Sequence, residues 1–301
     1  MIGLVKITMV KDTKVVSFIN YKGGVGKTTL AVEISASLAK KGKDVLLIDL
    51  DPQTNATFYL MEEKDWNDWQ ENKGSLKDLF EAFMDGKSFD INKAINKDLN
   101  CSKYIPKLHL LPSHLELLFI DLELASKFGA KGMKSKSILR SALSKIKENY
   151  DYIIFDCPPN LNLVTQNSIV ASNSIIIVAM PEYLSTIGIA LIDRAIKNIE
   201  KEINDEIKSF GVVGTFKGPE IKGILFNRVR YVTGGTGYQE EVMERVRVDW
   251  SHLVFNTYVS QSDRIAQRGE SKIPIAISGY AADKKYESQL RECAEEFLRR
   301  V

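Results

Sequence analysis

The stretch that decides the fold is Lys22-Gly23-Gly24-Val25-Gly26-Lys27-Thr28-Thr29. It follows an apolar run over Val15–Ile19 and opens a segment with helical periodicity that extends to about Lys40. Glycines between a strand and a helix let the backbone curl with its N–H groups inward, and the helix start adds partial positive charge. The stretch therefore predicts a phosphate-binding loop, with nucleotide contacts from all residues at 23–29. Lys27 would reach the β- and γ-phosphates, and the Thr28 hydroxyl would ligate Mg²⁺.

Lys22 departs from an ordinary phosphate loop, because it places a second cation at the start of the loop. That position lies too far round the loop to repeat the role of Lys27 on the same nucleotide. Across a two-fold axis, however, Lys22 would contact the nucleotide of a second copy and supply in trans the charge that an arginine finger supplies elsewhere. We therefore predict a homodimer when ATP is bound, with Lys22 and Lys27 both taking part in catalysis. The alternative is a solvated lysine.

Two acidic segments follow apolar runs and complete the predicted site. One is Asp49-Leu50-Asp51-Pro52-Gln53, and the other is Asp156-Cys157-Pro158-Pro159. In a parallel sheet the carboxyl ends of the strands form the ligand crevice. We expect Asp156 to hold Mg²⁺ through water, Asp49 to support the metal and the loop, and Asp51 to orient the attacking water. Each aspartate alone would be a turn or cap residue, but their coincidence with the loop favours catalysis with ATP and Mg²⁺ as cofactors.

Short apolar runs alternate with helical stretches along the chain. Several runs are apolar throughout, which is typical of parallel strands covered on both faces. This order predicts a doubly wound α/β fold of the P-loop NTPase kind, with a mostly parallel sheet flanked by helices on both faces. The expected strands are Val15–Ile19, Val45–Ile48, Leu108–Leu111, Tyr152–Phe155, Ser174–Val178, Ile221–Phe226 and Leu253–Phe255.

Helical periodicity between these runs predicts three apolar stripes. They are Leu30, Ile34 and Leu38; Leu115, Leu118, Phe119 and Leu122; and Ile189, Ile192, Ile196 and Ile199. Because no linker rich in Pro, Gly or Ser divides the chain, we expect residues 1–301 to form one domain. The segment at about 61–107 differs, since it carries Trp66, Trp69 and many charges. We interpret it as a helical excursion between strands, either a surface elaboration or a docking site.

Composition limits the possible functions. The 301-residue chain has 44% hydrophobic and 27% charged residues, which argues against a disordered or fibrous protein. Its formal net charge is +2, so contact with nucleic acid requires a local patch. Three distant cysteines and three histidines argue against a disulfide framework and a multi-histidine metal site. No run is long enough to span a membrane and Met1–Val10 lacks the layout of a secretory signal, so we expect a cytoplasmic protein with no membrane partner.

Three motifs occur in the order and spacing of a known family. They are KGGVGKTT at 22–29, DLDPQTNAT at 49–57 and YDYIIFDCPP at 150–159. In these motifs the chain resembles the ParA/Soj-type partition ATPases, whose deviant Walker A, A′ and B motifs look like them. The resemblance runs from about Lys14 to Val301 and includes the stretches LHLLPSHLELLFIDLELA and VFNTYVSQSDRIAQRGESKIPI.

The resemblance implies an ATPase in which ATP sandwiches two subunits into a dimer that binds double-stranded DNA without sequence preference. A ParB-like partner would stimulate hydrolysis and release the dimer. The protein would be nucleoid-associated and would segregate or position a plasmid, chromosome or protein cargo. By the same resemblance, Lys22 is the signature lysine, Asp51 is the hydrolytic aspartate, and Asn227 reads the adenine base.

Two positions depart from the family pattern. Thr54 and Asn162 stand where relatives commonly have glycine. Both are expected near the dimer face, so they bear on hydrolysis and dimer stability more than on nucleotide binding. The few residues before Lys14 are too short for a helix-turn-helix, and we expect the short, Soj-like class that binds DNA non-specifically.

Arginine placement predicts a DNA-binding patch in the C-terminal third. Of the eleven arginines, nine lie at or after Arg228. Guanidinium groups fit phosphate oxygens and give sequence-independent, salt-dependent affinity. The alternative is a solvated surface, because the same region carries many glutamates. The predicted DNA-binding residues are Arg228, Arg230, Arg264, Arg268 and Lys272, whereas the basic stretch Lys131–Lys147 is interpreted as an exposed helix face.

A MinD-like membrane-associated positioning ATPase is the main alternative, because it shares the phosphate site. Such a protein needs an amphipathic helix with a lipid-facing apolar stripe and basic flanks. Here the stripe of Tyr286, Leu290, Cys293 and Phe297 is opposed by glutamates, so we expect this helix to pack on the domain. A kinase or amidoligase would need its own acceptor constellation, and an electron-transfer reductase would need paired cysteines.

Overall fold

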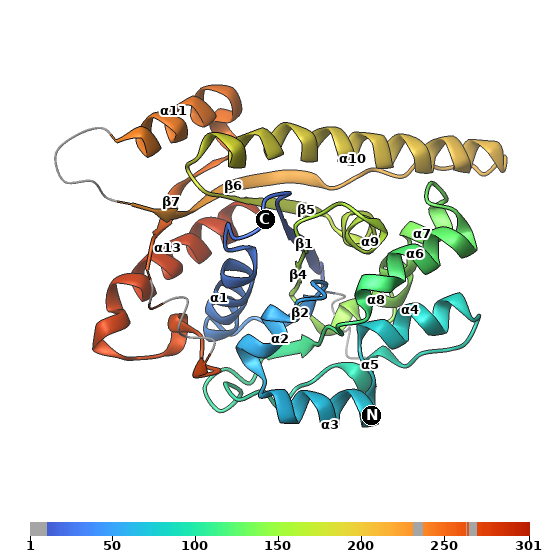
Figure 1. Ribbon diagram of the computed structural model, residues 1–301, viewed down its shortest axis with the longest axis horizontal. Coiled ribbons are helices and arrows are strands. Elements are labelled where there is room, and N and C mark those ends of the chain that lie inside the picture. The colour runs from blue at the N-terminus through green and yellow to red at the C-terminus, as the bar shows by residue number, and fades with distance from the viewer. Residues whose placement is uncertain (1–10, 231–236, 263, 265–269) are drawn as a thin grey trace, which may run out of the picture.

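The computed structural model describes residues 11–230, 237–262, 264 and 270–301. In these residues a parallel sheet of seven strands forms the centre, in the order β3-β2-β4-β1-β5-β6-β7 (Figure 1). The predicted α/β fold is confirmed, although β6 and β7 extend beyond the expected runs. The strands are β1 (Lys14–Ile19), β2 (Val45–Asp49), β3 (Leu108–Leu111), β4 (Tyr152–Asp156), β5 (Ser174–Ala179), β6 (Glu220–Val229) and β7 (Val254–Ser260).

Helices cover both faces of the sheet (Figure 1). They are α1 (Lys27–Lys40), α2 (Asn55–Leu60), α3 (Glu63–Lys73), α4 (Leu76–Met84), α5 (Ile91–Ala94), α6 (Leu117–Phe128), α7 (Met133–Lys136), α8 (Ile138–Leu143), α9 (Leu163–Ala171), α10 (Tyr183–Ser209), α11 (Tyr238–Trp250) and α13 (Lys284–Arg300). Short 3₁₀ turns are η1 (Lys147–Asn149), η2 (Ser251–Leu253), η4 (Ile275–Ile277) and η5 (Ala281–Asp283).

Alternate residues of the strands point to opposite faces of the sheet and belong to two apolar layers, one on each face. On β1, Val16 and Phe18 pack in the layer of α1 and α13, whereas Val15 and Ile19 pack in the layer of α6, α9 and α10. All five residues of β2 are buried, as are all six of β5. Both sides of these strands are covered by helices, which explains why their sequences are apolar throughout. The first strand lies between β4 and β5, so the chain reverses its direction across the sheet beside the phosphate loop.

Two of the three predicted helical stripes are confirmed, and the third is wrong. The stripes of α1 and α10 are buried. In contrast, the residues predicted to form the stripe of α6 are between 54% and 72% exposed: Leu115, Leu118, Phe119 and Leu122. The buried face of α6 consists of Leu117, Ile120 and Leu124.

A polar contact explains which face of α6 turns inward. The helix is apolar on nearly every side, so its periodicity permits more than one buried face. The Asp121 carboxylate accepts the backbone N–H of Val164 at 2.9 Å, at the start of α9. This bond holds the Asp121 side of α6 against α9, whereas Leu118, Phe119 and Leu122 are exposed.

Two tryptophans anchor the segment at 61–107, which contains α3, α4 and α5. The indole N–H of Trp66 donates to the carbonyl oxygen of Ser113 at 3.0 Å, and that of Trp69 donates to Ala94 at 3.1 Å. Trp66 is buried, so the segment is tied to the turn after β3 rather than extended into solvent.

The C-terminal helix α13 packs on the sheet, as predicted. Leu290, Cys293 and Phe297 are fully buried, and the ring of Phe297 stacks on Phe18 of β1 with 6.1 Å between centroids. Its apolar stripe is therefore used inside the protein. Across the described residues, none of the helices combines the length and the apolar character that crossing a membrane requires.

Candidate nucleotide-binding site

The phosphate loop connects β1 to α1 at the carboxyl edge of the sheet. Gly24 and Gly26 have φ angles of 74° and 90°, in the left-handed region that favours glycine. Gly26 also lacks room for a side chain, because an ideal Cβ there would lie 2.0 Å from Nδ2 of Asn227. The same nitrogen donates a hydrogen bond to the carbonyl oxygen of Val25 at 2.9 Å. Asn227, on β6, therefore supports the loop through this hydrogen bond and through its contact with Gly26.

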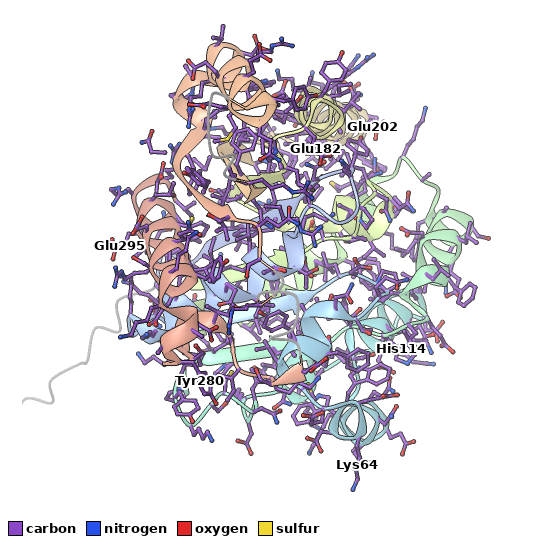
Figure 2. The ribbon with its side chains drawn as sticks, turned by 60° about the vertical axis from the view of Figure 1, so that its left-hand side comes forward. Lys64, His114, Glu182, Glu202, Tyr280 and Glu295 are labelled. Carbon is purple, nitrogen blue, oxygen red and sulfur yellow. The ribbon has the colours of Figure 1, made fainter. Side chains whose placement is uncertain are left out.

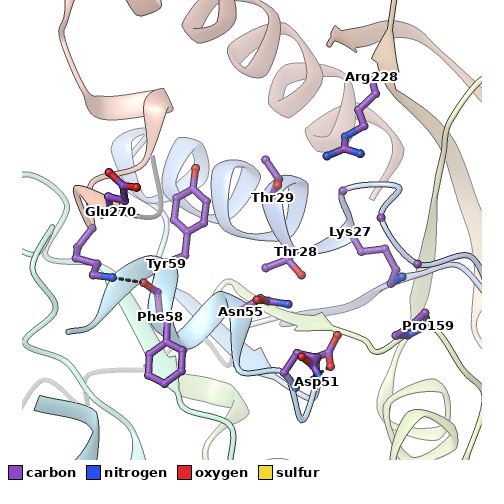
Figure 3. A pocket seen from close by; sticks show the side chains of 15 residues that line it. Lys27, Thr28, Thr29, Asp51, Asn55, Phe58, Tyr59, Pro159, Arg228 and Glu270 are labelled. Carbon is purple, nitrogen blue, oxygen red and sulfur yellow. Dashed lines mark hydrogen bonds between the residues drawn. The ribbon is translucent and has the colours of Figure 1, made fainter. Parts of the chain in front are cut away.

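A cavity of about 620 Å³ opens in front of the loop (Figure 3). This volume lies within the range of small-molecule sites. Its described lining comes from the loop, the turn after β2, the helix α2 and the C-terminal third. The lining residues are Gly23, Gly24, Gly26, Lys27, Thr28, Thr29, Asp51, Gln53, Asn55, Phe58, Tyr59, Pro159, Arg228, Glu270 and Lys272.

Two predicted nucleotide contacts, Val25 and Asn227, are buried and stand outside the described lining of this cavity. Val25 contributes its backbone to the loop, which is the role that the motif requires. The base contact that the resemblance implied for Asn227 stays a prediction, since its amide nitrogen here serves the loop.

Lys27 lies at the cavity with 6% of its surface exposed. Its ammonium donates a hydrogen bond to the carbonyl oxygen of Lys22 at 3.1 Å. Burial lowers the pKa of Lys27, and the nearby carboxylates of Asp156 and Asp51 partly oppose this shift. A neighbouring anion offsets the free-energy cost of burying a cation. The position of Lys27 therefore suits a bound phosphate group.

Asp49 organises the turn that follows β2. One carboxylate oxygen accepts the N–H of Asp51 at 3.1 Å, and the other accepts the N–H and the hydroxyl of Thr57 at 2.8 and 2.7 Å. Burial raises the pKa of Asp49 to about 7, against the effect of the hydrogen bonds from Thr57. Both oxygens are thus engaged inside the protein. This geometry is compatible with the predicted role of Asp49 in supporting the loop, and its predicted metal contact stays a prediction.

Asp156 is fully buried beside Asp49, its partner in the parallel register of β4 and β2. Within the described residues, neither of its oxygens has a hydrogen-bond partner of ordinary geometry. Burial and the charge of Asp49 raise the pKa of Asp156 well above its usual value, while the nearby Thr28 hydroxyl and Lys27 ammonium act to lower it. Such a carboxylate next to a hydroxyl fits Mg²⁺, which prefers oxygen ligands.

The donor set also suits Mg²⁺ better than a transition metal. Nowhere in the described ranges do three or more His, Cys, Asp or Glu side chains converge on a metal position. Mg²⁺ commonly uses one or two protein oxygens together with substrate phosphates and water, and Thr28 and Asp156 would fit such a donor set.

Asp51 lines the cavity at the turn below α2 (Figure 3). Its Oδ1 accepts the N–H of Gln53 at 2.9 Å, and its carbonyl oxygen accepts the Ser113 hydroxyl at 2.7 Å. These contacts fix the carboxylate at the cavity wall, where its predicted role requires it.

Thr54, three residues after Asp51, has a φ of 53°, in the region that favours glycine. This is the position where the family pattern commonly has glycine.

Lys22 is paired within its own subunit. Its Nζ lies 2.5 Å from Oε2 of Glu182, the residue that directly precedes α10. Sequence reasoning missed Glu182. The available signal was an acid in the short turn after the apolar strand β5, at the same edge of the sheet as Asp51 and Asp156.

Two of the predicted DNA-binding residues lie at the nucleotide cavity. Arg228 and Lys272 line the nucleotide cavity, where Figure 3 shows Arg228 and Glu270 on opposite sides. The Lys272 ammonium donates to the carbonyl oxygen of Phe58 at 2.8 Å, and its side chain is 14% exposed. Its contact with DNA stays a prediction, since in this structure the ammonium belongs to the cavity wall.

The remaining predicted DNA contacts are separate from that wall. Arg230 is exposed beside a hollow between β6, β7 and α11, and its Nε donates to Oε1 of Gln261 at 2.5 Å. Arg264 is exposed, and its N–H donates to the Ser262 hydroxyl at 3.1 Å. Arg268 lies outside the described residues.

Glu33 is a further supporting residue that sequence reasoning missed. It is fully buried in α1, where its Oε1 accepts the N–H of Ile275 and the hydroxyl of Tyr59, both at 2.8 Å. Its Oε2 accepts the N–H of Ala276 at 2.8 Å. Because Tyr59 lines the cavity, this carboxylate ties the cavity wall to α1 and η4. The available signal was a charged residue beside the apolar stripe of a predicted helix.

Comparison with known proteins places this site in a family. Residues 13–209 match the AAA_31 family, described as an AAA domain. The chain is 30% identical to the sporulation initiation inhibitor protein Soj of Bacillus subtilis, over 88% of this chain and 90% of that protein. It is 28% identical to the chromosome-partitioning ATPase Soj of Treponema pallidum, over 93% of this chain and 96% of that protein.

A solved structure shares the fold. The chain matches a Cyanothece McdA variant in complex with ATP with a TM-score of 0.69 and 20% identity, covering 97% of this chain and 98% of that one. The family match, the Soj relatives and the loop geometry agree. The protein is therefore a member of the ParA/Soj family of ATPases.

Proposed function

We propose that the protein is a partition or positioning ATPase that binds ATP with Mg²⁺ in the loop cavity and hydrolyses it. The observation that carries this proposal is the placement of Lys27, Thr28 and Asp51 around one cavity at the carboxyl edge of the sheet. The buried carboxylate of Asp156 lies behind this lining, close enough to Thr28 and Lys27 for both to lower its pKa. The name of the Treponema pallidum relative supports partition as the purpose of hydrolysis.

Each residue has a distinct task in this proposal. The backbone N–H groups of the loop and the Lys27 ammonium bind the phosphates. Asp51 orients the water that attacks the terminal phosphorus. Thr28 and Asp156 would hold Mg²⁺, which supplies positive charge to the phosphate oxygens when bound. Lys22 of a second copy adds a cation from across the dimer.

Dimerisation and DNA binding are linked in this proposal. ATP joins two copies, so the exposed guanidinium groups of Arg230 and Arg264 are doubled and avidity for DNA phosphates rises. A ParB-like adaptor then stimulates hydrolysis and releases the DNA. The cargo is a plasmid, a chromosome or a protein assembly, and the ATPase acts in the cytoplasm on the nucleoid. Residues 1–301 act as one ATPase domain, with the helical segment at about 61–107 as an excursion.

The packing of α13 favours this function over a MinD-like membrane role. Its apolar residues Leu290 and Phe297 are fully buried against the sheet. A lipid-binding helix needs such a stripe on its outer face. Robust ATP-dependent sedimentation with anionic liposomes would overturn this preference.

The test is ATP binding and turnover in three variants. Lys27→Ala should lose ATP binding, whereas Asp51→Ala should bind ATP and lose hydrolysis. Glu220→Gln is the control. Glu220 pairs with Lys217 and Lys222 at the first residue of β6, whereas Asn227, which contacts the phosphate loop, lies near the last. This variant should leave turnover unchanged. Turnover that persists in Lys27→Ala would refute the site.

A further inference from the structure

The ion pair of Lys22 with Glu182 joins the start of the phosphate loop to the start of α10. Its two charged atoms are 2.5 Å apart, and the side chains are 33% and 40% exposed. Figure 2 shows Glu182 on the side of α10 that faces the rest of the molecule. The proposed hydrolysis leaves this contact without a role, since it requires Lys22 to reach a second copy.

The backbone around Lys22 is held independently of this pair. The N–H of Lys22 donates to Oδ1 of Asn20 at 3.0 Å, and Nδ2 of Asn20 donates to the carbonyl oxygen of Val178 at 2.7 Å. The carbonyl oxygen of Lys22 accepts the Lys27 ammonium at 3.1 Å. The helix α10 also packs closely against Asn20, because a Cβ at Gly188 would lie 2.9 Å from Oδ1 of Asn20. The ammonium can therefore change partner by side-chain rotation alone.

Glu182 is held within reach of Lys22 by its own backbone. Its N–H donates to the carbonyl oxygen of Met180 at 2.7 Å, in the turn between β5 and α10. It is also the N-cap position of a 27-residue helix, where a negative charge is favourable. The backbone of Glu182 is thus fixed at the start of α10, with its carboxylate within reach of Lys22.

We propose that Glu182 is a positioning residue that keeps the Lys22 ammonium in its own subunit until a second, nucleotide-loaded copy is present. This inference rests on the proposed ATP dimer. Lys22 must leave Glu182 to reach the partner's triphosphate, so the pair opposes dimerisation. A triphosphate carries more negative charge than one carboxylate, and the exchange is therefore favourable only when the facing copy holds its nucleotide. Glu182 makes dimerisation depend on that nucleotide.

The expected effect is modest, because both side chains are partly exposed. Ion pairs of this exposure change an equilibrium by a few-fold at most. We expect Glu182→Gln to lower the dimer dissociation constant about 2- to 5-fold in Mg²⁺ and ATPγS. The affinity of the monomer for the nucleotide should stay unchanged, because Glu182 is outside the described lining of the cavity.

The experiment is sedimentation velocity on the full chain over a range of protein concentrations, with Mg²⁺ and ATPγS so that hydrolysis does not interfere. It compares the wild type with Glu182→Gln, Lys22→Gln and the double variant. Glu220→Gln is the matched control, because it removes an ion-paired glutamate far from the loop. Thermal melting confirms that each variant is folded, and Glu182→Asp, whose carboxylate is one methylene shorter, should give a smaller shift in the same direction if Glu182→Gln fails to fold.

The outcomes separate this inference from the proposed function. A wild type that stays monomeric in ATPγS would overturn the proposed dimer itself. If the wild type dimerises and Lys22→Gln does not, the dimer stands, and a dissociation constant of Glu182→Gln that is equal to or above the wild-type value would overturn the role of Glu182. Recovery of dimers in the double variant would also overturn it, since Glu182 is proposed to act through Lys22 alone. Tighter dimers in Glu182→Gln, with Glu220→Gln unchanged, would establish it.

Discussion

The amide of Asn227 fills the space that a side chain at Gly26 would need. An ideal Cβ at Gly26 would lie 2.0 Å from Nδ2, and this nitrogen also donates to the carbonyl oxygen of Val25 at 2.9 Å. A residue of β6 therefore sets the shape of a loop 202 positions earlier in the chain. The glycine is needed for this contact as well as for its positive φ.

Gly26→Ala should abolish ATP binding, because the methyl group displaces Asn227 and with it the loop. Gly42 is the matched control, since its φ is 84° and nothing lies within 4 Å of its ideal Cβ. Gly42→Ala should cost about 1–2 kcal/mol of unfolding free energy from backbone strain and leave ATP affinity unchanged. Urea unfolding and titration with a fluorescent ATP analogue measure both quantities. Equal ATP affinities in the two variants would contradict the role of Asn227.

Arg228→Gly should stabilise the protein by about 0.5–1 kcal/mol, because Arg228 has a φ of 57°, where an L-residue is strained and glycine is not. Arg230→Gly is the control, since Arg230 is also exposed, is absent from the positive-φ residues described and donates to Gln261. It should destabilise the protein. Both variants lose a guanidinium group, so DNA titration at low salt compares their contributions to binding. A melting temperature of Arg228→Gly below that of the wild type would contradict backbone strain at Arg228.

The two sides of α6 should respond differently to truncation. Leu124→Ala removes a fully buried side chain and should cost about 2–5 kcal/mol of unfolding free energy. Leu122→Ala, where the side chain is 72% exposed, should change it by less than about 0.5 kcal/mol. Urea unfolding of the two variants decides which face is buried, and a large cost at Leu122 would reverse the assignment.

Glu296 should make stability depend on acid pH. Its carboxylate accepts the N–H groups of Asn256 and Thr257 at 3.0 and 2.9 Å and pairs with Arg300 at 2.6 Å. Burial acts to raise the pKa of Glu296, but the hydrogen bonds and Arg300 outweigh it and hold the pKa below its usual value. A lowered pKa means that this stabilisation is present above the unfolded-state value of about 4.3 and is lost as pH falls through the folded-state value.

Glu296→Gln should therefore lower the unfolding free energy by about 1–3 kcal/mol at neutral pH. The difference from the wild type should shrink as pH falls below about 4. Glu295→Gln is the control on the same helix, because Glu295 is 43% exposed and pairs with Lys41, and it should have little effect. A difference between wild type and Glu296→Gln that stays constant with pH would contradict the assignment.

Features encoded by neighbouring residues could be predicted from the sequence. Lys27 and Thr28 belong to a loop whose strand and helix flank it directly, and Asp51 and Asp156 each follow an apolar run. Parallel strands end at a common edge, so local patterns were enough to bring these groups to the same edge of the sheet.

Features set by distant contacts could not be predicted in this way. The pairing of Lys22 with Glu182 arises because β1 and β5 are adjacent in the sheet, which no local pattern specifies. The buried face of α6 depends on the bond from Val164 to Asp121, across two elements. Likewise, Lys272 belongs to the cavity wall because its segment returns to α2, and its charge alone could not indicate this contact.

The buried carboxylate of Glu33 has a thermodynamic consequence for ligand binding. It joins α1, which begins at Lys27, to Tyr59 of α2 and to the backbone of η4. Two helices that border the cavity, α1 and α2, are therefore joined to each other and to η4 before any ligand binds. Such preorganisation removes the entropic penalty of ordering the walls, so more of the interaction energy with a nucleotide is retained as affinity.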